Sequence, residues 1–231
     1  IIYTGQELVN FKVLPNRKSM IRFNCDYNEG THPAILERLS KTNMEQIPGY
    51  GEDHYCRQAA DLIRAKCQAP QAAVHFLVGG TQTNLTVIAS ALKPYQSVIS
   101  ADCGHINVHE TGAIEATGHR IISVPSTDGK ISAAQVQQIC EAHYADDNPE
   151  FASQPKMVYI SFPTEYGTLY TKQELQELHE VCQKNNLFLF VDGARLGYAL
   201  TAKKNTVSLP ELASLCDVFY IGGTKVGALF G

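Results

Sequence analysis

Apolar positions in the middle of the chain follow two periods, one typical of helices and one typical of buried strands. After Asp53, apolar side chains recur every three or four residues as far as Cys67, which predicts a helix with Asp53 as its N-terminal cap. Residues 73–78 form a short apolar run, which predicts a strand buried on both faces. A second helix is expected to begin at Thr81, directly after a Gly-Gly pair.

The alternation of strands and capped helices continues to the end of the chain. Further apolar runs predict strands at 97–100, 120–124, 156–162, 187–191 and 217–221. Two pairs three residues apart, Ser132 with Gln135 and Thr171 with Glu174, predict capping boxes that begin helices between these strands. Strands that alternate with helices indicate a mostly parallel sheet covered on both faces, so the expected fold is a three-layer α/β fold.

Composition narrows the class of protein. Of the 231 residues, 44% are hydrophobic and 18% are charged, which is enough for a sizeable core and unlike a disordered chain. The formal net charge of -4 disfavours nonspecific binding to nucleic acid or to acidic membranes. No apolar run approaches the roughly 20 residues needed to cross a bilayer, so no membrane span is expected.

The cysteines and the two ends of the chain carry further expectations. Seven cysteines without a C-x-x-C pair indicate reduced thiols in a cytoplasmic protein. Residues 1–19 lack the apolar core of a secretion signal and are interpreted as a leader, native or added, before one domain over 20–231. The apolar stretch 228–230 begins another strand where the sequence stops, so we expect the chain to be the front portion of a longer enzyme.

Candidate ligand contacts follow the first predicted strand, because ligands of parallel α/β sheets bind at the carboxyl ends of the strands. The strand at 73–78 leads into Gly79, Gly80 and Thr81, where glycines and the free N–H groups of a helix start favour a phosphate. The alternative is an ordinary glycine turn with Thr81 as N-cap. Neither G-x-G-x-x-G nor the Walker pattern is present, which argues against a dinucleotide or ATP.

An acid and a lysine follow two later strands. Asp192 ends the strand at 187–191, and a buried carboxylate needs compensation such as a cationic pyridinium would give. Arg195 offers a fork for a carboxylate, and its alternative role is a structural pair with Asp192. Lys225 lies in a glycine-rich turn, where it can lose its proton and form a Schiff base; the alternative is a surface lysine.

A phosphate cradle, an acid and a lysine in this order are what pyridoxal 5'-phosphate requires. His105, between two predicted strands, could stack on the cofactor ring and relay a proton. The rival interpretation is a metal site with Cys103 and His109. Because H-E-x-x-H and a second ligand cluster are both missing from the sequence, no metal is expected.

Seven motifs together carry a family resemblance. They are FNCDYNEGTHPAIL, YGEDHY, GGTQTN, GHINVHETGAIEATGH, FPTEYGTLYTKQELQEL, VDGARLGYAL and YIGGTKVGALFG. From Phe23 to Gly231 the chain resembles the low-specificity threonine aldolases, a group of beta-eliminating lyases among the fold-type-I pyridoxal phosphate enzymes. The resemblance implies the large domain of the aspartate-aminotransferase-like fold, with the small C-terminal domain missing beyond Gly231.

The resemblance assigns cofactor contacts to five residues. It implies that Lys225 is the Schiff-base lysine and that Asp192 pairs with the pyridine nitrogen. It implies that His105 stacks on the ring and serves as a candidate base at the substrate hydroxyl. Gly80 and Thr81 would hold the phosphate.

Four further roles follow from the same resemblance. Glu110 lies where the family keeps an acid close to the site. Arg195 would contact the substrate carboxylate or help to hold the ring. Cys25 takes the place of a serine that helps to bind the substrate carboxylate in the family, and Tyr50 would reach the cofactor of a neighbouring subunit.

The implied reaction is retro-aldol cleavage of a β-hydroxy-α-amino acid, with threonine giving glycine and acetaldehyde. The intact protein is expected to be a homodimer or homotetramer with active sites at the subunit interface. Three alternatives stay open. They are β-elimination or transamination with the same cofactor, an inactive fragment or binding protein on the same scaffold, and a nicotinamide oxidoreductase, which the missing dinucleotide fingerprint disfavours.

Overall fold

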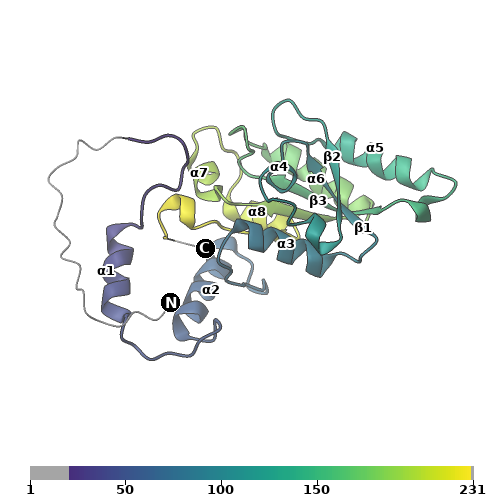
Figure 1. Ribbon diagram of the computed structural model, residues 1–231. Coiled ribbons are helices and arrows are strands. Elements are labelled where there is room, and N and C mark those ends of the chain that lie inside the picture. Colours follow the sequence, from purple (N-terminus) through teal and green to yellow (C-terminus); the bar gives the residue numbers. More distant parts are fainter. Residues whose placement is uncertain (1–20, 230–231) are drawn as a thin grey trace.

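A five-stranded sheet forms the centre of the molecule (Figure 1). The computed structural model describes residues 21–229. The strands are β1 (Gln96–Ala101), β2 (Arg120–Val124), β3 (Gln154–Ser161), β4 (Phe188–Asp192) and β5 (Val218–Phe219). They lie in the order β2-β1-β3-β4-β5, and every neighbouring pair is parallel. The predicted α/β fold with a parallel sheet is therefore confirmed.

Helices lie in the connections between the strands, as parallel pairing requires, and three more precede the first strand. Within residues 21–229 they are α1 (Pro33–Thr42), α2 (His54–Cys67), α3 (Gly80–Ala91), α4 (His105–Val108), α5 (Ala133–Tyr144), α6 (Lys172–Lys184), α7 (Leu196–Thr201) and α8 (Leu209–Leu215). The two predicted capping boxes, at Ser132 for α5 and at Thr171 for α6, are both present. Asp53 caps α2 by accepting a hydrogen bond from the N–H of Cys56, as predicted.

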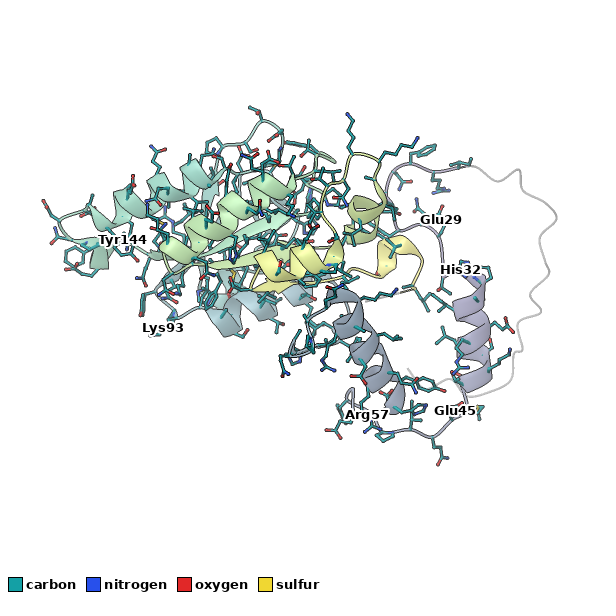
Figure 2. The ribbon with its side chains drawn as sticks, turned by 180° about the vertical axis from the view of Figure 1, so that it is seen from behind. Glu29, His32, Glu45, Arg57, Lys93 and Tyr144 are labelled. Atoms are coloured by element: carbon teal, nitrogen blue, oxygen red, sulfur yellow. The ribbon has the colours of Figure 1, made fainter. Side chains whose placement is uncertain are left out.

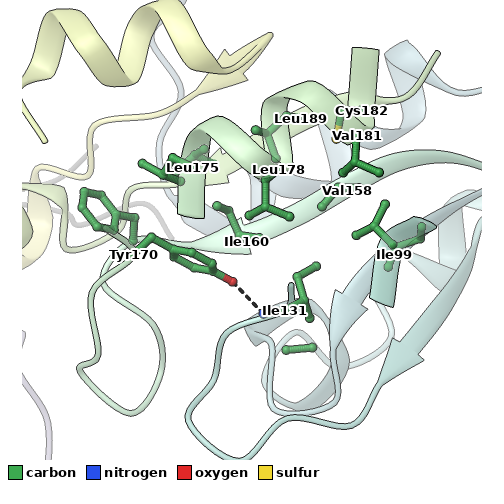
Figure 3. Packing of buried hydrophobic residues seen from close by; sticks show 14 of the residues in the cluster. Ile99, Ile131, Val158, Ile160, Tyr170, Leu175, Leu178, Val181, Cys182 and Leu189 are labelled. Atoms are coloured by element: carbon green, nitrogen blue, oxygen red, sulfur yellow. Dashed lines mark hydrogen bonds between the residues drawn. The ribbon is translucent and has the colours of Figure 1, made fainter. Parts of the chain in front are cut away.

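The core has two layers, one on each face of the sheet. Successive side chains of a strand point to opposite faces, and in β3 this places Val158 and Ile160 in one layer and Met157 and Tyr159 in the other. The first layer is closed by α5 and α6, and Figure 3 shows residues of α6 stacked on β3. The second layer is closed by α3, where Ile88 is fully buried.

The predicted strand at 73–78 is wrong. This segment forms neither a helix nor a strand, and Phe76 and Val78 are exposed. A strand needs a neighbour to share its backbone hydrogen bonds, and within residues 21–229 the edge strand β5 pairs only with β4. The prediction at 217–221 is too long, because β5 covers two residues. The helix expected at Thr81 begins one residue earlier, at Gly80.

The N-terminal segment, defined here as residues 21–79, differs from the sheet. Its helix α1 was not predicted, contains no buried residue and lies apart from the strands in Figures 1 and 2. His32 and Glu45 mark the two ends of this outlying part in Figure 2. The segment is fastened to the rest of the chain where the N–H of His32 and the hydroxyl of Thr31 both donate to the carbonyl of Gly227.

Two expectations fall outside the described residues. The leader proposed for 1–19 lies entirely outside them, and so does Phe230 at the end of the predicted strand 228–230. Within residues 21–229, no helix is both long enough and apolar enough to cross a membrane.

Candidate active site

The candidate residues gather at the carboxyl ends of the strands. The chain leaves β1 and enters α4 at His105, β4 ends at Asp192, and the loop after β5 carries Lys225. Because the strands are parallel, these three ends lie along one edge of the sheet, the edge at which open α/β folds bind ligands.

Asp192 is a buried carboxylate held by four donors. Its Oδ1 accepts from the N–H of Ala194 at 2.9 Å and from the hydroxyl of Tyr220 at 2.5 Å. Its Oδ2 accepts from the side-chain amide of Asn84 at 3.1 Å and from the hydroxyl of Tyr159. Such donors compensate the cost of burying the carboxylate.

Arg195 pairs with a residue far away in the sequence. Its Nε and Nη2 donate to the two carboxylate oxygens of Asp26, the second at 3.1 Å. The hydrogen bond from Arg195 lowers the pKa of Asp26 and raises that of Arg195. The alternative of a structural Asp192–Arg195 pair is therefore wrong, because the fork is turned toward the N-terminal segment.

His105 and Glu110 form a second pair beside Asp192. Nδ1 of His105 lies 2.8 Å from Oε1 of Glu110, and the hydrogen bond raises the pKa of His105. Asn84 donates to the same oxygen at 2.6 Å and so bridges Glu110 and Asp192. The other oxygen of Glu110 and the amide oxygen of Asn84 are buried without a hydrogen-bond partner. Two such orphaned polar atoms point to a polar group that binds here.

Lys225 lies in the turn after β5, half-buried beside the other charged groups. Desolvation lowers its pKa, and the positive charge of Arg195 acts in the same direction. The strand ends that carry Asp192 and Lys225 approach each other closely, since the N–H of Gly222 donates to the carbonyl of Gly193 at 2.9 Å. A Cβ at Gly222 would lie 2.6 Å from the carbonyl oxygen of Ala194, so only glycine allows this approach.

Gly80 and Thr81 begin α3 at the same edge. The N-cap residue is Gly79, which has no side chain that could cap the helix. The alternative of Thr81 as N-cap is therefore wrong. The free N–H groups of the first turn suit an anion. A Cβ at Gly80 would lie 2.8 Å from the hydroxyl of Tyr220, which places this turn next to Asp192.

A small hollow lies between these groups. It contains about 240 Å³ of empty space, part of it open to solvent, and is lined by His105, Ser161, Pro163, Glu165, Asp192, Ala194 and Arg195. Oε1 of Glu165 accepts from the backbone N–H of His105 at 2.8 Å and from the hydroxyl of Ser161 at 2.5 Å. Glu165 thereby fixes the start of α4 and adds a carboxylate to the hollow.

Cys25 and Tyr50 lie outside this cluster. The thiol of Cys25 donates to the side chain of Asn28 at 3.0 Å, although the next residue, Asp26, reaches Arg195. Tyr50 is fully exposed in the loop between α1 and α2. The substrate and interface roles of both residues stay predictions, as do the roles of the other site residues.

Five site residues were missed from the sequence: Asn84, Tyr159, Tyr220, Glu165 and Asp26. Three of them carried a usable signal. Asn84 precedes Ile88 by four residues and therefore lies on the buried side of α3, and a buried tyrosine such as Tyr159 needs a partner for its hydroxyl. Tyr220 directly follows the two apolar residues of β5, so its hydroxyl also needs a partner. Asp26 and Glu165 lie in irregular segments without such a pattern.

A metal site receives no support from the described part of the chain. Among residues 21–229, no group of three or more His, Cys, Asp or Glu side chains is arranged to hold a metal ion.

Comparison with known proteins gives a consistent set of relatives. The family model described as beta-eliminating lyase matches residues 25–229. A low specificity L-threonine aldolase from Pseudomonas sp. (strain NCIMB 10558) is 29% identical over 91% of this chain and 60% of its own length. One from Escherichia coli (strain K12) is 29% identical over 78% of this chain and 53% of its own length. The chain thus spans at most about 60% of these two relatives.

Solved structures agree with the sequence relatives. The threonine aldolase of Leishmania major matches with a TM-score of 0.85 and 48% identity, covering 89% of this chain and 59% of the other. An aminotransferase from Escherichia coli matches with a TM-score of 0.64 at 14% identity, over 88% of this chain and 49% of the other, which shows a shared fold alone. The resemblance inferred from the seven motifs and the aspartate-aminotransferase-like fold are confirmed.

Proposed function

Because the chain belongs to the beta-eliminating lyase family, we propose that it is part of a pyridoxal phosphate-dependent lyase that cleaves β-hydroxy-α-amino acids. Threonine, giving glycine and acetaldehyde, is the proposed substrate. The observation that carries the proposal is the meeting of Lys225, Asp192 and the His105–Glu110 pair at one edge of the sheet. The threonine aldolases it is similar to supply the choice of substrate.

The residues present fit the proposed cofactor. The first turn of α3, at Gly80 and Thr81, offers N–H groups to a phosphate. Asp192 offers a buried carboxylate to a protonated ring nitrogen, and the orphaned oxygens of Glu110 and Asn84 lie beside it. When bound, pyridoxal phosphate withdraws the electrons of the bond that breaks at the substrate's α-carbon.

The side chains at the site then have separate proposed roles. The lowered pKa of Lys225 leaves more of its amine unprotonated, which is the form that would hold the cofactor. Asp192 holds a proton at the ring nitrogen. His105, oriented by Glu110, accepts the proton of the substrate hydroxyl, and Arg195 binds the substrate carboxylate.

An absorbance titration tests the cofactor assignment. Purified protein mixed with pyridoxal phosphate should develop a visible band that borohydride removes, and Lys225→Ala should not. Lys204→Ala, a change at an exposed lysine, is the matched control and should behave like wild type. A wild-type protein without the band contradicts the cofactor assignment.

Product analysis separates this reaction from its nearest alternative. The family description favours β-elimination as the second candidate, and that reaction uses the same Lys225 and Asp192. Acetaldehyde from threonine supports aldol cleavage, whereas pyruvate from serine or cysteine supports β-elimination.

We further infer a homo-oligomer, a dimer or tetramer, in which the N-terminal segment contacts a second copy. Leu36 and Leu39 of α1 and Met44 after it are exposed in the single chain, and an apolar helix face of this kind is normally covered. Tyr50 follows this face and would reach the neighbouring copy.

Seven unpaired thiols support a reducing, cytoplasmic location.

A further inference from the structure

The carboxylate of Asp192 has no spare acceptor position. An ionised carboxylate accepts about four hydrogen bonds, two at each oxygen. Oδ1 accepts from Ala194 and Tyr220, and Oδ2 accepts from Asn84 and Tyr159. A fifth donor, such as a protonated ring nitrogen, therefore binds only where one of these four gives way.

Three of the four donors are fixed in place. The N–H of Ala194 belongs to the backbone turn after β4. Asn84 is fully buried and is also tied to Glu110, and Tyr159 is 1% exposed within the core. The side chain of Tyr220 is the one that is only partly buried, at the end of the edge strand. It is the donor that can leave at the lowest cost.

The position of the Tyr220 hydroxyl adds a second reason. It lies 2.5 Å from Oδ1 of Asp192, and a Cβ at Gly80 would lie 2.8 Å from it. It therefore stands between the carboxylate and the first turn of α3. A ring that joins Asp192 to a phosphate at that turn has to cross the same space.

We propose that the two tyrosines act on Asp192 with opposite effects on cofactor binding. Tyr159 is a positioning residue that stays on Oδ2 and holds the carboxylate in place for the ring nitrogen. Tyr220 competes with that nitrogen for Oδ1 and is displaced when the cofactor binds. The proposal rests on the proposed function, because it concerns the same cofactor.

A matched pair of variants tests the proposal, since each removes one hydroxyl from the same carboxylate. Tyr220→Phe removes the competitor and should tighten pyridoxal phosphate binding by roughly tenfold, the effect of one hydrogen bond to a charged group. Tyr159→Phe removes a retained donor and should weaken binding by a similar factor. Dissociation constants come from fluorescence titration, with the exposed Tyr95→Phe as the control that should leave binding unchanged.

An analogue with a ring carbon in place of the nitrogen sharpens the test. It offers no N–H to Asp192, so the gain from Tyr220→Phe should disappear with it. Weaker or unchanged pyridoxal phosphate binding by Tyr220→Phe would overturn the proposal, as would an equal gain with the analogue. These outcomes need only the Tyr220 variant and therefore hold even if Tyr159→Phe does not fold.

Failure of the proposed function looks different from failure of this proposal. In that case wild type forms no borohydride-sensitive band through Lys225. If the band forms and the two tyrosine variants still shift affinity in the same direction, the cofactor assignment stands and the competition by Tyr220 is wrong.

Discussion

The sheet and the N-terminal segment use similar residues with different results. In β3 and β4 almost every apolar side chain is buried, and the polar residues that end these strands, Ser161 and Asp192, are hydrogen-bonded. In α1 no residue is buried, and Leu36 and Leu39 face outward. The sheet brings the proposed cofactor contacts together within one chain, whereas the segment with Cys25 and Tyr50 presents the exposed apolar side chains for which we propose a second copy as partner.

Truncating one leucine in each region should give the largest difference. Leu178 of α6 is 1% exposed, so Leu178→Ala should lower the free energy of unfolding by about 2–5 kcal/mol. Leu36→Ala, at a residue 57% exposed, should lower it by less than about 0.5 kcal/mol when the protein is dilute enough to be monomeric. Urea unfolding measures both. Equal losses would mean that α1 packs onto the body of the chain.

A charge on α1 should weaken self-association. Leu36→Asp places a carboxylate on the apolar face and should raise the dissociation constant of the oligomer by roughly tenfold or more. Glu37→Gln, on an exposed position of the same helix, is the matched control. Sedimentation equilibrium measures both, and unchanged association of the Asp variant would contradict an interface at α1.

Helix caps offer a smaller test of the same contrast. Ser132 begins α5 with a capping box, so Ser132→Ala should cost about 1 kcal/mol of unfolding free energy. His32 caps the unburied α1, and His32→Ala should leave global unfolding unchanged while lowering helicity locally. Thermal unfolding followed by circular dichroism compares the two. A larger loss of unfolding free energy in His32→Ala than in Ser132→Ala would contradict the view that α1 contributes little to global stability.

The smallest expected effect concerns the pH dependence of the His105–Glu110 pair. Glu110 raises the pKa of His105 above its ordinary 6.5, so the pair stabilises the fold fully below that pH and less as pH rises through the raised value. Glu110→Gln should lower the pKa of His105 in an NMR titration. The stability difference between variant and wild type should shrink as pH rises. A pKa that does not move would contradict the pairing.

Features that depend on residues close together in the sequence were predicted correctly. Features that depend on pairing between distant segments were not. The capping boxes at Ser132 and Thr171 depend on residues three apart, and both formed. The strand at 73–78 depends on a neighbour that no local pattern supplies. All five strands of the sheet were predicted from their apolar runs, although β5 is shorter than expected.

The site shows the same division. Asp192 and Lys225 were predicted because each lies close to the carboxyl end of a predicted strand. Asn84 and Tyr220 were missed because their common partner, Asp192, lies far from each of them in the sequence. The Asp26–Arg195 pair joins residues far apart in the sequence, and only the folded chain brings them together.

The close approach at Gly193 and Gly222 has a consequence for sequence change. A Cβ at Gly193 would overlap the carbonyl of Tyr220, and one at Gly222 would collide with Ala194, whereas a Cβ at Gly79 would meet nothing within 4 Å. A saturation library should therefore accept alanine at Gly79 and reject every side chain at the other two positions. The two glycines therefore set the distance between the segments that carry Asp192 and Lys225, because any side chain at either position would push the two backbones apart.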